Sequence, residues 1–208
     1  MKHSRLFLLG IACLTLIGLA SCLGDSTTYN GLSRAEKAKC LAAVKGDYTG
    51  KMIYQARNPA DINDTQDTVD VRWTITADST FILHEFPTVV LAEYIYDENV
   101  KEALLEQEPI KDLTGPIGFT LLTPYVEYVI APQRLEMPVF YNGSTHTLTV
   151  IFWVNSSSFG ITYETTRETV VRLNMAAAYI DDNTGFNLFN NYTTDPVNIP
   201  MLLFNKEE

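Results

Sequence analysis

Metal or acid–base chemistry in this sequence would involve histidine first, and two of its three histidines, His84 and His146, are the candidates considered. They fall on different predicted strands, and neither has a second ligand at the spacing that zinc sites use. The segment "HEFPT" departs from the HExxH motif, because Thr88 stands where the second histidine would be. We therefore expect both side chains to be solvent-facing or hydrogen-bonded, and we predict no metal site and no cofactor.

The acidic segment "DINDTQD" at residues 61–67 places side-chain oxygens at alternate positions, as a calcium-binding loop does. However, Gln66 occupies the position of the sharp-turn glycine, and Arg72 occupies that of the bidentate glutamate. The pattern favours an acidic surface loop between strands, and whether calcium binds there stays open.

No motif for a nucleophile is present. The sequence lacks GxSxG, and Cys40 has no obvious histidine partner. Acidic side chains are plentiful, but pairing two of them for glycoside hydrolysis requires a spatial separation that a sequence does not give. We therefore predict no catalytic residue, and an envelope hydrolase acting on glycans through a carboxylate pair remains the alternative.

The segment "GFNLFNNYTTD" near the C-terminus combines aromatic and amide side chains. Aromatic faces stack on sugar rings, and amides donate to and accept from hydroxyl groups. This pattern predicts a glycan site that consists of Phe186, Asn187, Phe189 and Tyr192. The alternative is a terminal loop whose aromatic residues cover the core, and the general tendency of aromatic side chains to be buried favours it.

The N-terminus has the features of an export signal. Lys2 and Arg5 precede an apolar run, residues 6–20, which is shorter than the ~20 residues that span a membrane as a helix. The run ends in "LASC", which resembles the bacterial lipobox, and Cys22 is then the residue that becomes lipidated. We predict a signal peptide at 1–21. Because Leu23 and not an aspartate follows, we expect outer-membrane attachment, on the periplasmic face or the cell surface.

Charge and cysteine content exclude some functions. The chain carries a formal net charge of −10, and the signal segment removes two basic residues and no acidic ones. So acidic a chain repels phosphate backbones, which disfavours nucleic acid as a partner. Of the three cysteines, Cys13 leaves with the signal and Cys22 is acylated. Cys40 therefore has no partner for an intramolecular disulfide, and we expect it to be packed in the core.

The helices and strands can be predicted from capping residues, turn residues and the spacing of hydrophobic residues. Residues 22–33 are small and polar and read as a tether. "SRAE" is a capping box that starts a helix at Ser33, and Asp97 caps a second helix that ends before Pro109. Alternation at 69–77, the "NG" turn at 142–143 and a last apolar run at 198–204 predict antiparallel strands.

These elements predict an α+β fold for residues 34–208. It is a single domain, mainly antiparallel β, and forms a β-sandwich or a partly closed barrel with two short helices.

Several segments together resemble a family of uncharacterised lipoproteins from gut Bacteroidota, known only as a domain of unknown function. The segments are the lipobox, the helix before "YTGKMIY", "VDVRWTITADST" leading into "FP", "NGSTHTLTV" and "AYIDD". The resemblance implies a single exported domain and supplies no catalytic or binding residue.

Three tripeptides resemble the O-glycosylation sequence of exported proteins in such bacteria, with Ser26, Thr68 and Ser79 as acceptors. At Ser79 an ordinary turn explains the residues equally well.

We therefore expect a lipid-anchored cell-envelope lipoprotein that acts as a non-enzymatic binding or structural module. Its partners are the membrane, through Cys22, and a glycan, an envelope component or another protein. The sequence leaves the oligomeric state open.

Overall fold

The computed structural model describes residues 31–57, 65–109, 111–190 and 193–205. Residues 34–208 form one compact unit. The predicted signal peptide, Cys22 and most of the tether lie outside the described residues. No helix in the described part of the chain is long and apolar enough to cross a membrane.

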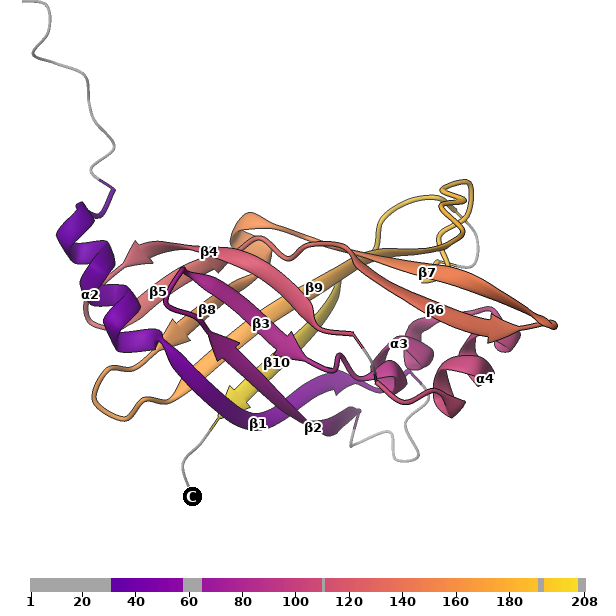
Figure 1. Cartoon of the computed structure of the whole chain (residues 1–208), viewed down its shortest axis with the longest axis horizontal. Helices are drawn as coiled ribbons and strands as arrows, with labels where there is room; N and C mark the ends of the chain where they lie inside the picture. The colour runs from indigo at the N-terminus through magenta and orange to yellow at the C-terminus, as the bar shows by residue number, and fades with distance from the viewer. Residues whose placement is uncertain (1–30, 58–64, 110, 191–192, 206–208) are drawn as a thin grey trace, which may run out of the picture. The chain divides into compact units, whose positions relative to one another are not determined.

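A closed antiparallel barrel of eight strands forms the body of this unit (Figure 1). Its strands follow the order of the chain around the ring, and β10 closes it by pairing with both β9 and β1. The barrel strands are β1 (Gly46–Gln55), β2 (Gln66–Ile75), β3 (Thr80–His84), β4 (Leu113–Leu121), β5 (Val126–Ile130), β8 (Phe159–Thr162), β9 (Thr169–Ile180) and β10 (Ile199–Asn205).

Alternation along the strands fills the barrel with side chains. Tyr48 and Met52 on β1 and Trp73 and Ile75 on β2 are all buried, while Thr49 and Lys51 on β1 are exposed and Thr74 on β2 is half-buried. Tyr48 and Trp73 are register partners, and their rings stack with centroids 5.4 Å apart. An eight-stranded barrel is just wide enough for such side chains to occupy its interior.

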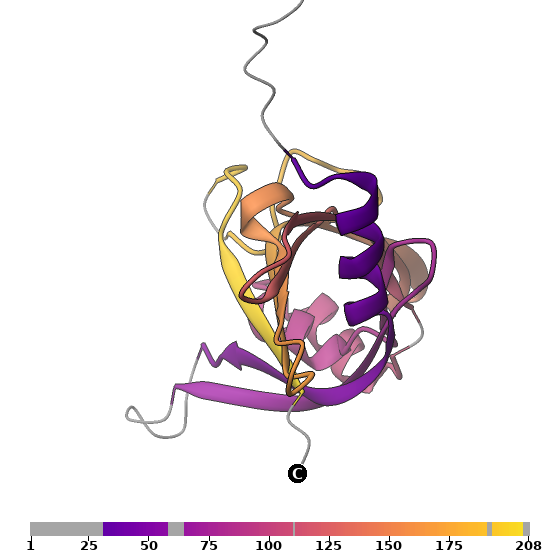
Figure 2. The same ribbon diagram turned by 90° about the vertical axis from the view of Figure 1, so that its left-hand side faces the viewer.

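Helix α2 (Arg34–Val44) lies at one end of the barrel (Figure 2). Its residues line two small pockets together with Ser79, Thr123 and Glu164 of the β2–β3, β4–β5 and β8–β9 turns. Cys40 and Val44 are fully buried, and burial raises the pKa of the Cys40 thiol. The expectation that Cys40 is a packed residue is confirmed.

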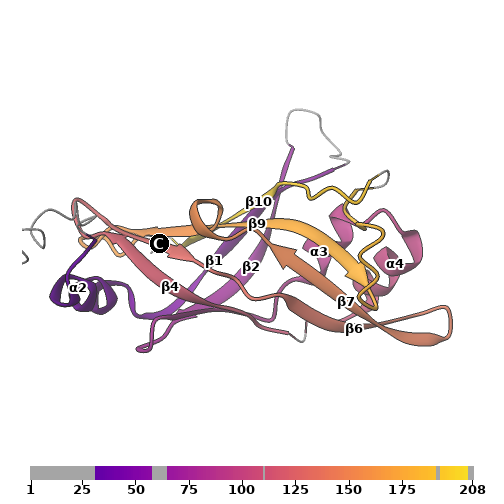
Figure 3. The ribbon, with the colours of Figure 1, turned by 90° about the horizontal axis from the view of Figure 1, so that it is seen from above.

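An extension continues the sheet beyond the other end of the barrel. The hairpin of β6 (Leu135–Tyr141) and β7 (Ser144–Phe152) is inserted between β5 and β8. It pairs with the second half of β9, while the first half of β9 stays in the barrel. Helices α3 (Thr88–Tyr94) and α4 (Glu98–Glu106) join β3 to β4 and lie beside this hairpin (Figure 3).

The predicted α+β class with mainly antiparallel strands is confirmed, and of the two architectures the barrel is the correct one. The "NG" hairpin is present, with φ of 49° at Asn142 and 78° at Gly143. Asp97 caps α4 as predicted, by accepting hydrogen bonds from the Asn99 and Val100 N–H groups at 3.0 and 3.1 Å. The expected number of helices is wrong, because the described residues contain a third α-helix, α3.

Candidate functional site

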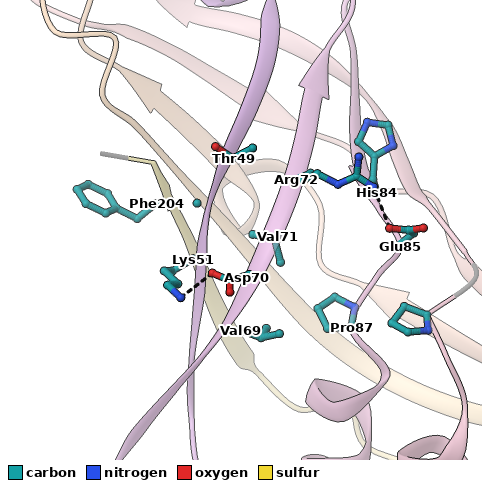
Figure 4. A pocket seen from close by; sticks show the side chains of 12 residues that line it. Thr49, Lys51, Val69, Asp70, Val71, Arg72, His84, Glu85, Pro87 and Phe204 are labelled. Carbon is teal, nitrogen blue, oxygen red and sulfur yellow. Dashed lines mark hydrogen bonds and ion pairs between the residues drawn. The ribbon is translucent and has the colours of Figure 1, made fainter. Parts of the chain in front are cut away.

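A groove of about 840 Å³ lies on the outside of the barrel (Figure 4). We call it the β1–β2 groove. Its floor is the outer surface of β1 and β2, and Phe204 on β10 borders it. Pro87, just before α3, and Pro109, after α4, also line it.

The strand register places two ion pairs in the groove. Successive side chains on a strand point to opposite sides. Because Met52, Val71 and Trp73 point inward, their neighbours Lys51, Asp70 and Arg72 point outward. Lys51 lies directly opposite Asp70, and Lys51 Nζ is 2.5 Å from Asp70 Oδ1.

Arg72 and Glu85 form the second pair, with Arg72 Nη2 2.9 Å from Glu85 Oε2. The four charged side chains are each more than half exposed, so they are accessible to a ligand.

His84 lies in the groove and is held by neighbours on both sides. Its Nδ1 is 3.3 Å from Asp112 Oδ2, and its Nε2 is 2.9 Å from Thr74 Oγ1. The Thr74 hydroxyl in turn donates to Asp47 Oδ1 at 2.7 Å. The expectation of a hydrogen-bonded strand histidine is confirmed at this position.

The four charged side chains of the groove form two ion pairs with one another. The two cations and two anions balance each other, and each carboxylate is paired with its own cation. Val69, Phe204 and the two prolines add apolar surface beside them. The predicted alternative of a free carboxylate pair therefore gains no support from this groove.

The structure corrects the predicted glycan site at two of its residues. Asn187 is fully buried, and its Oδ1 accepts from the Ala178 and Phe189 N–H groups at 3.0 and 3.1 Å. Phe189 is 5% exposed, whereas Phe186 is 43% exposed. Tyr192 lies outside the described residues. Asn187 and Phe189 therefore attach the β9–β10 connection to the core and cannot contact a sugar.

The predicted O-glycosylation acceptors differ in their surroundings. Thr68 is exposed on β2, and Ser79 is half-buried in the β2–β3 turn with a φ of 63°. In that turn the Thr76 hydroxyl donates to Asp78, which lowers the pKa of the Asp78 carboxyl. Ser26 lies outside the described residues, and modification at all three positions stays a prediction.

Most of the segment considered for calcium, residues 61–64, also lies outside the described residues. Asp67, at its end, accepts a hydrogen bond from the Tyr54 hydroxyl at 3.3 Å. Burial, with Asp67 nearby, raises the pKa of Tyr54 to about 12. Within the part of the chain that the structure covers, no group of three His, Cys, Asp or Glu side chains is arranged to hold a metal ion.

The sequence analysis missed one cluster that the fold brings together. Ser144 Oγ is 2.8 Å from His146 Nε2, and His146 Nδ1 is 2.7 Å from Asp181 Oδ2. The two-residue spacing of Ser144 and His146 on one strand was visible in the sequence. The proximity of Asp181 to them was not visible, because it arises only from the pairing of β7 with β9.

Comparison with known proteins identifies a family and no function. A family model described as a domain of unknown function, DUF4840, matches residues 43–180, from the end of α2 to the end of β9. Searches of curated proteins and of solved structures give no match. The family match covers more than half of the chain, so this protein belongs to the DUF4840 family.

Proposed function

We propose that this protein is a lipoprotein of the bacterial outer membrane, anchored through Cys22, whose barrel binds an oligosaccharide in the β1–β2 groove. The basic start, the short apolar run and "LASC" support the anchor. Acyl chains on Cys22 would bury more methylene groups than a single myristoyl chain does, which makes the attachment stable. Attachment holds the barrel at the membrane surface, where envelope or environmental glycans are within reach.

The observation that carries the binding proposal is the composition of the groove. Its volume of about 840 Å³ lies within the range of small-ligand sites, roughly 300–1,000 Å³. Lys51, Asp70, Arg72 and Glu85 supply donors and acceptors at the spacing of adjacent strands. Phe204 and the prolines supply apolar surface for the C–H faces of sugar rings.

The charge of the groove and of the whole chain favours a neutral over an acidic oligosaccharide. The four charged side chains of the groove sum to zero, and the chain as a whole carries −10. A polyanionic glycan is repelled by that net charge and gains no excess of cations in the groove. A neutral oligosaccharide is therefore the ligand that fits best, and the groove is a binding site and not a catalytic one.

A thermal-shift screen of residues 23–208, which include the whole compact unit, tests this proposal. Neutral and acidic oligosaccharides are compared at matched concentrations. A ligand at a hundred times its dissociation constant adds about 2.7 kcal/mol, which raises the midpoint of a domain this size by roughly 5–10 °C. We expect shifts with neutral oligosaccharides. A panel in which only acidic glycans shift the midpoint, or in which none does, contradicts the proposal.

A further inference from the structure

The Ser144–His146–Asp181 cluster lies in the extension, away from the residues that line the β1–β2 groove. Ser144 is the first residue of β7 and follows the Asn142–Gly143 turn directly. Side chains two residues apart on a strand point to the same side, so β7 itself places the hydroxyl beside the imidazole. The turn and the strand together fix the distance between Ser144 and His146.

The direction of the hydrogen bonds follows from the chemistry of the three groups. An ionised carboxylate only accepts, so the Asp181 Oδ2 contact requires that His146 Nδ1 carries the proton. In the neutral ring, Nε2 is then an acceptor, and the Ser144 hydroxyl donates to it. This is the order of contacts by which a general base activates a serine nucleophile.

Asp181 is fixed in position by the backbone of β7. Its Oδ1 accepts from the Thr147 N–H at 2.8 Å, and its own N–H donates to the Thr147 carbonyl at 2.9 Å. Asp181 has a φ of 51°, a left-handed conformation that is uncommon for a residue other than glycine. The hydrogen bond from His146 lowers the pKa of the Asp181 carboxyl, so the group stays ionised and holds the ring.

His84 also lies between an aspartate and a hydroxyl group, but the hydrogen bonds there differ from those at His146. At His84 the hydroxyl of Thr74 gives its proton to Asp47 and not to the ring. Thr74 therefore lacks the donated hydrogen bond that activates a nucleophile, whereas Ser144 has it.

The cluster is accessible on one side and covered on another. Ser144 is exposed, and the side chain of His146 is 24% exposed. The Tyr141 ring stacks on the imidazole, with centroids 4.3 Å apart and planes at 29°. Apart from Gly143 itself and its chain neighbours Asn142 and Ser144, no atom lies within 4 Å of the position that a Cβ would occupy on Gly143, so no other part of the described chain covers the turn at that point.

We propose that Ser144 is a catalytic nucleophile that hydrolyses small, accessible esters, with His146 as its general base and Asp181 as a positioning residue. The Ser144 proton passes to His146 Nε2 as Oγ bonds to the carbonyl carbon. The ester C–O bond then breaks, and His146 returns the proton to the leaving alcohol. Water, deprotonated by His146, cleaves the acyl-serine to release the acid and restore Ser144. This activity is independent of oligosaccharide binding in the groove.

Labelling with a fluorophosphonate tests the proposal on the purified mature protein in mild detergent. The reagent forms a bond from phosphorus to the serine oxygen and releases fluoride. We expect one adduct per chain, located at Ser144 by peptide mass spectrometry, and release of p-nitrophenol from p-nitrophenyl acetate. Ser144→Ala should abolish both, and His146→Ala should slow labelling about 100-fold or more.

Two further variants separate catalysis from folding. Asp181→Asn keeps an acceptor for Thr147 but can present its amide N–H to His146, which would move the ring proton to Nε2 and suppress labelling while the melting temperature is retained. Thr145→Ala changes an exposed neighbour on the opposite side of β7 and should label like the wild type. Absence of an adduct on the wild type, or labelling that survives Ser144→Ala or His146→Ala, overturns the proposal.

Discussion

Tyr128 on β5 and Gly160 on β8 show how single residues determine the packing inside the barrel. The two are register partners, and the Tyr128 side chain is completely buried. A Cβ built on Gly160 would lie 2.2 Å from the Tyr128 ring, closer than any side chain tolerates. Gly160 is thus required because the tyrosine ring occupies the space over its Cα.

We predict that Gly160→Ala destabilises the protein by about 1–3 kcal/mol, the usual cost of overpacking a core. The matched control is Gly118→Ala, also within a strand, where the added Cβ meets only Val129 Cγ2 at 3.5 Å. That contact is ordinary, so the control should change stability by less than about 1 kcal/mol. Urea unfolding measures both, and equal effects would show that Tyr128 moves aside freely.

Residue roles could be predicted where the cause was local. Alternation correctly placed Val71, Trp73 and Ile75 in the interior. Asn187 was a possible glycan contact because an amide donates to and accepts from hydroxyl groups, although a loop that covers the core was the favoured alternative. Its amide instead bonds the backbone of Ala178 on β9, a partner that only the fold brings close.

At the level of elements, strong local signals gave correct predictions and weak ones were missed. The Asn142–Gly143 hairpin and the α4 cap at Asp97 each depend on a few neighbouring residues. Helix α3 begins after Pro87, which makes no side-chain cap hydrogen bond, so its start lacks the cap that marked the start of α4. Strand β8 has four residues, too few for a period of two to be recognised.

A prediction at the level of elements concerns β10, the strand that closes the barrel. Leu203 on β10 is completely buried inside the barrel, and Leu202 beside it is 39% exposed on the outside. We expect Leu203→Ala to cost about 2–5 kcal/mol, because it leaves a cavity at the closure of the barrel. Leu202→Ala should cost less than about 1 kcal/mol. Similar losses in denaturant unfolding would mean that β10 is not an integral barrel strand.

For the whole molecule, the sequence left a sandwich and a barrel equally open, because both produce the same inward–outward alternation. The choice depends on the pairing of β10 with β9 and β1, contacts between residues far apart in the chain. The division of β9 between barrel and extension is likewise set by its partners and not by its own residues.

The proposed attachment to the membrane through Cys22 gives the prediction at the scale of the molecule. We expect Cys22→Ser to abolish incorporation of labelled palmitate and to move the protein from the membrane fraction to the soluble fraction. Cys13→Ser, within the predicted signal peptide, should leave both unchanged. Palmitate labelling that persists in Cys22→Ser would show that the lipid is carried elsewhere.

The central claim, that the β1–β2 groove is a binding site, is tested most directly by calorimetry on two matched arginine variants. Arg72 pairs with Glu85 in the groove, and Arg134 pairs with Glu136 on β6; both side chains are about equally exposed, at 63% and 62%. Each exposed ion pair contributes at most about 1 kcal/mol to stability, so both variants should fold. With a neutral oligosaccharide that stabilises the wild type, Arg72→Ala should weaken binding at least roughly tenfold, by about 1.4 kcal/mol, while Arg134→Ala binds like the wild type. Equal affinities for the two variants would contradict the claim.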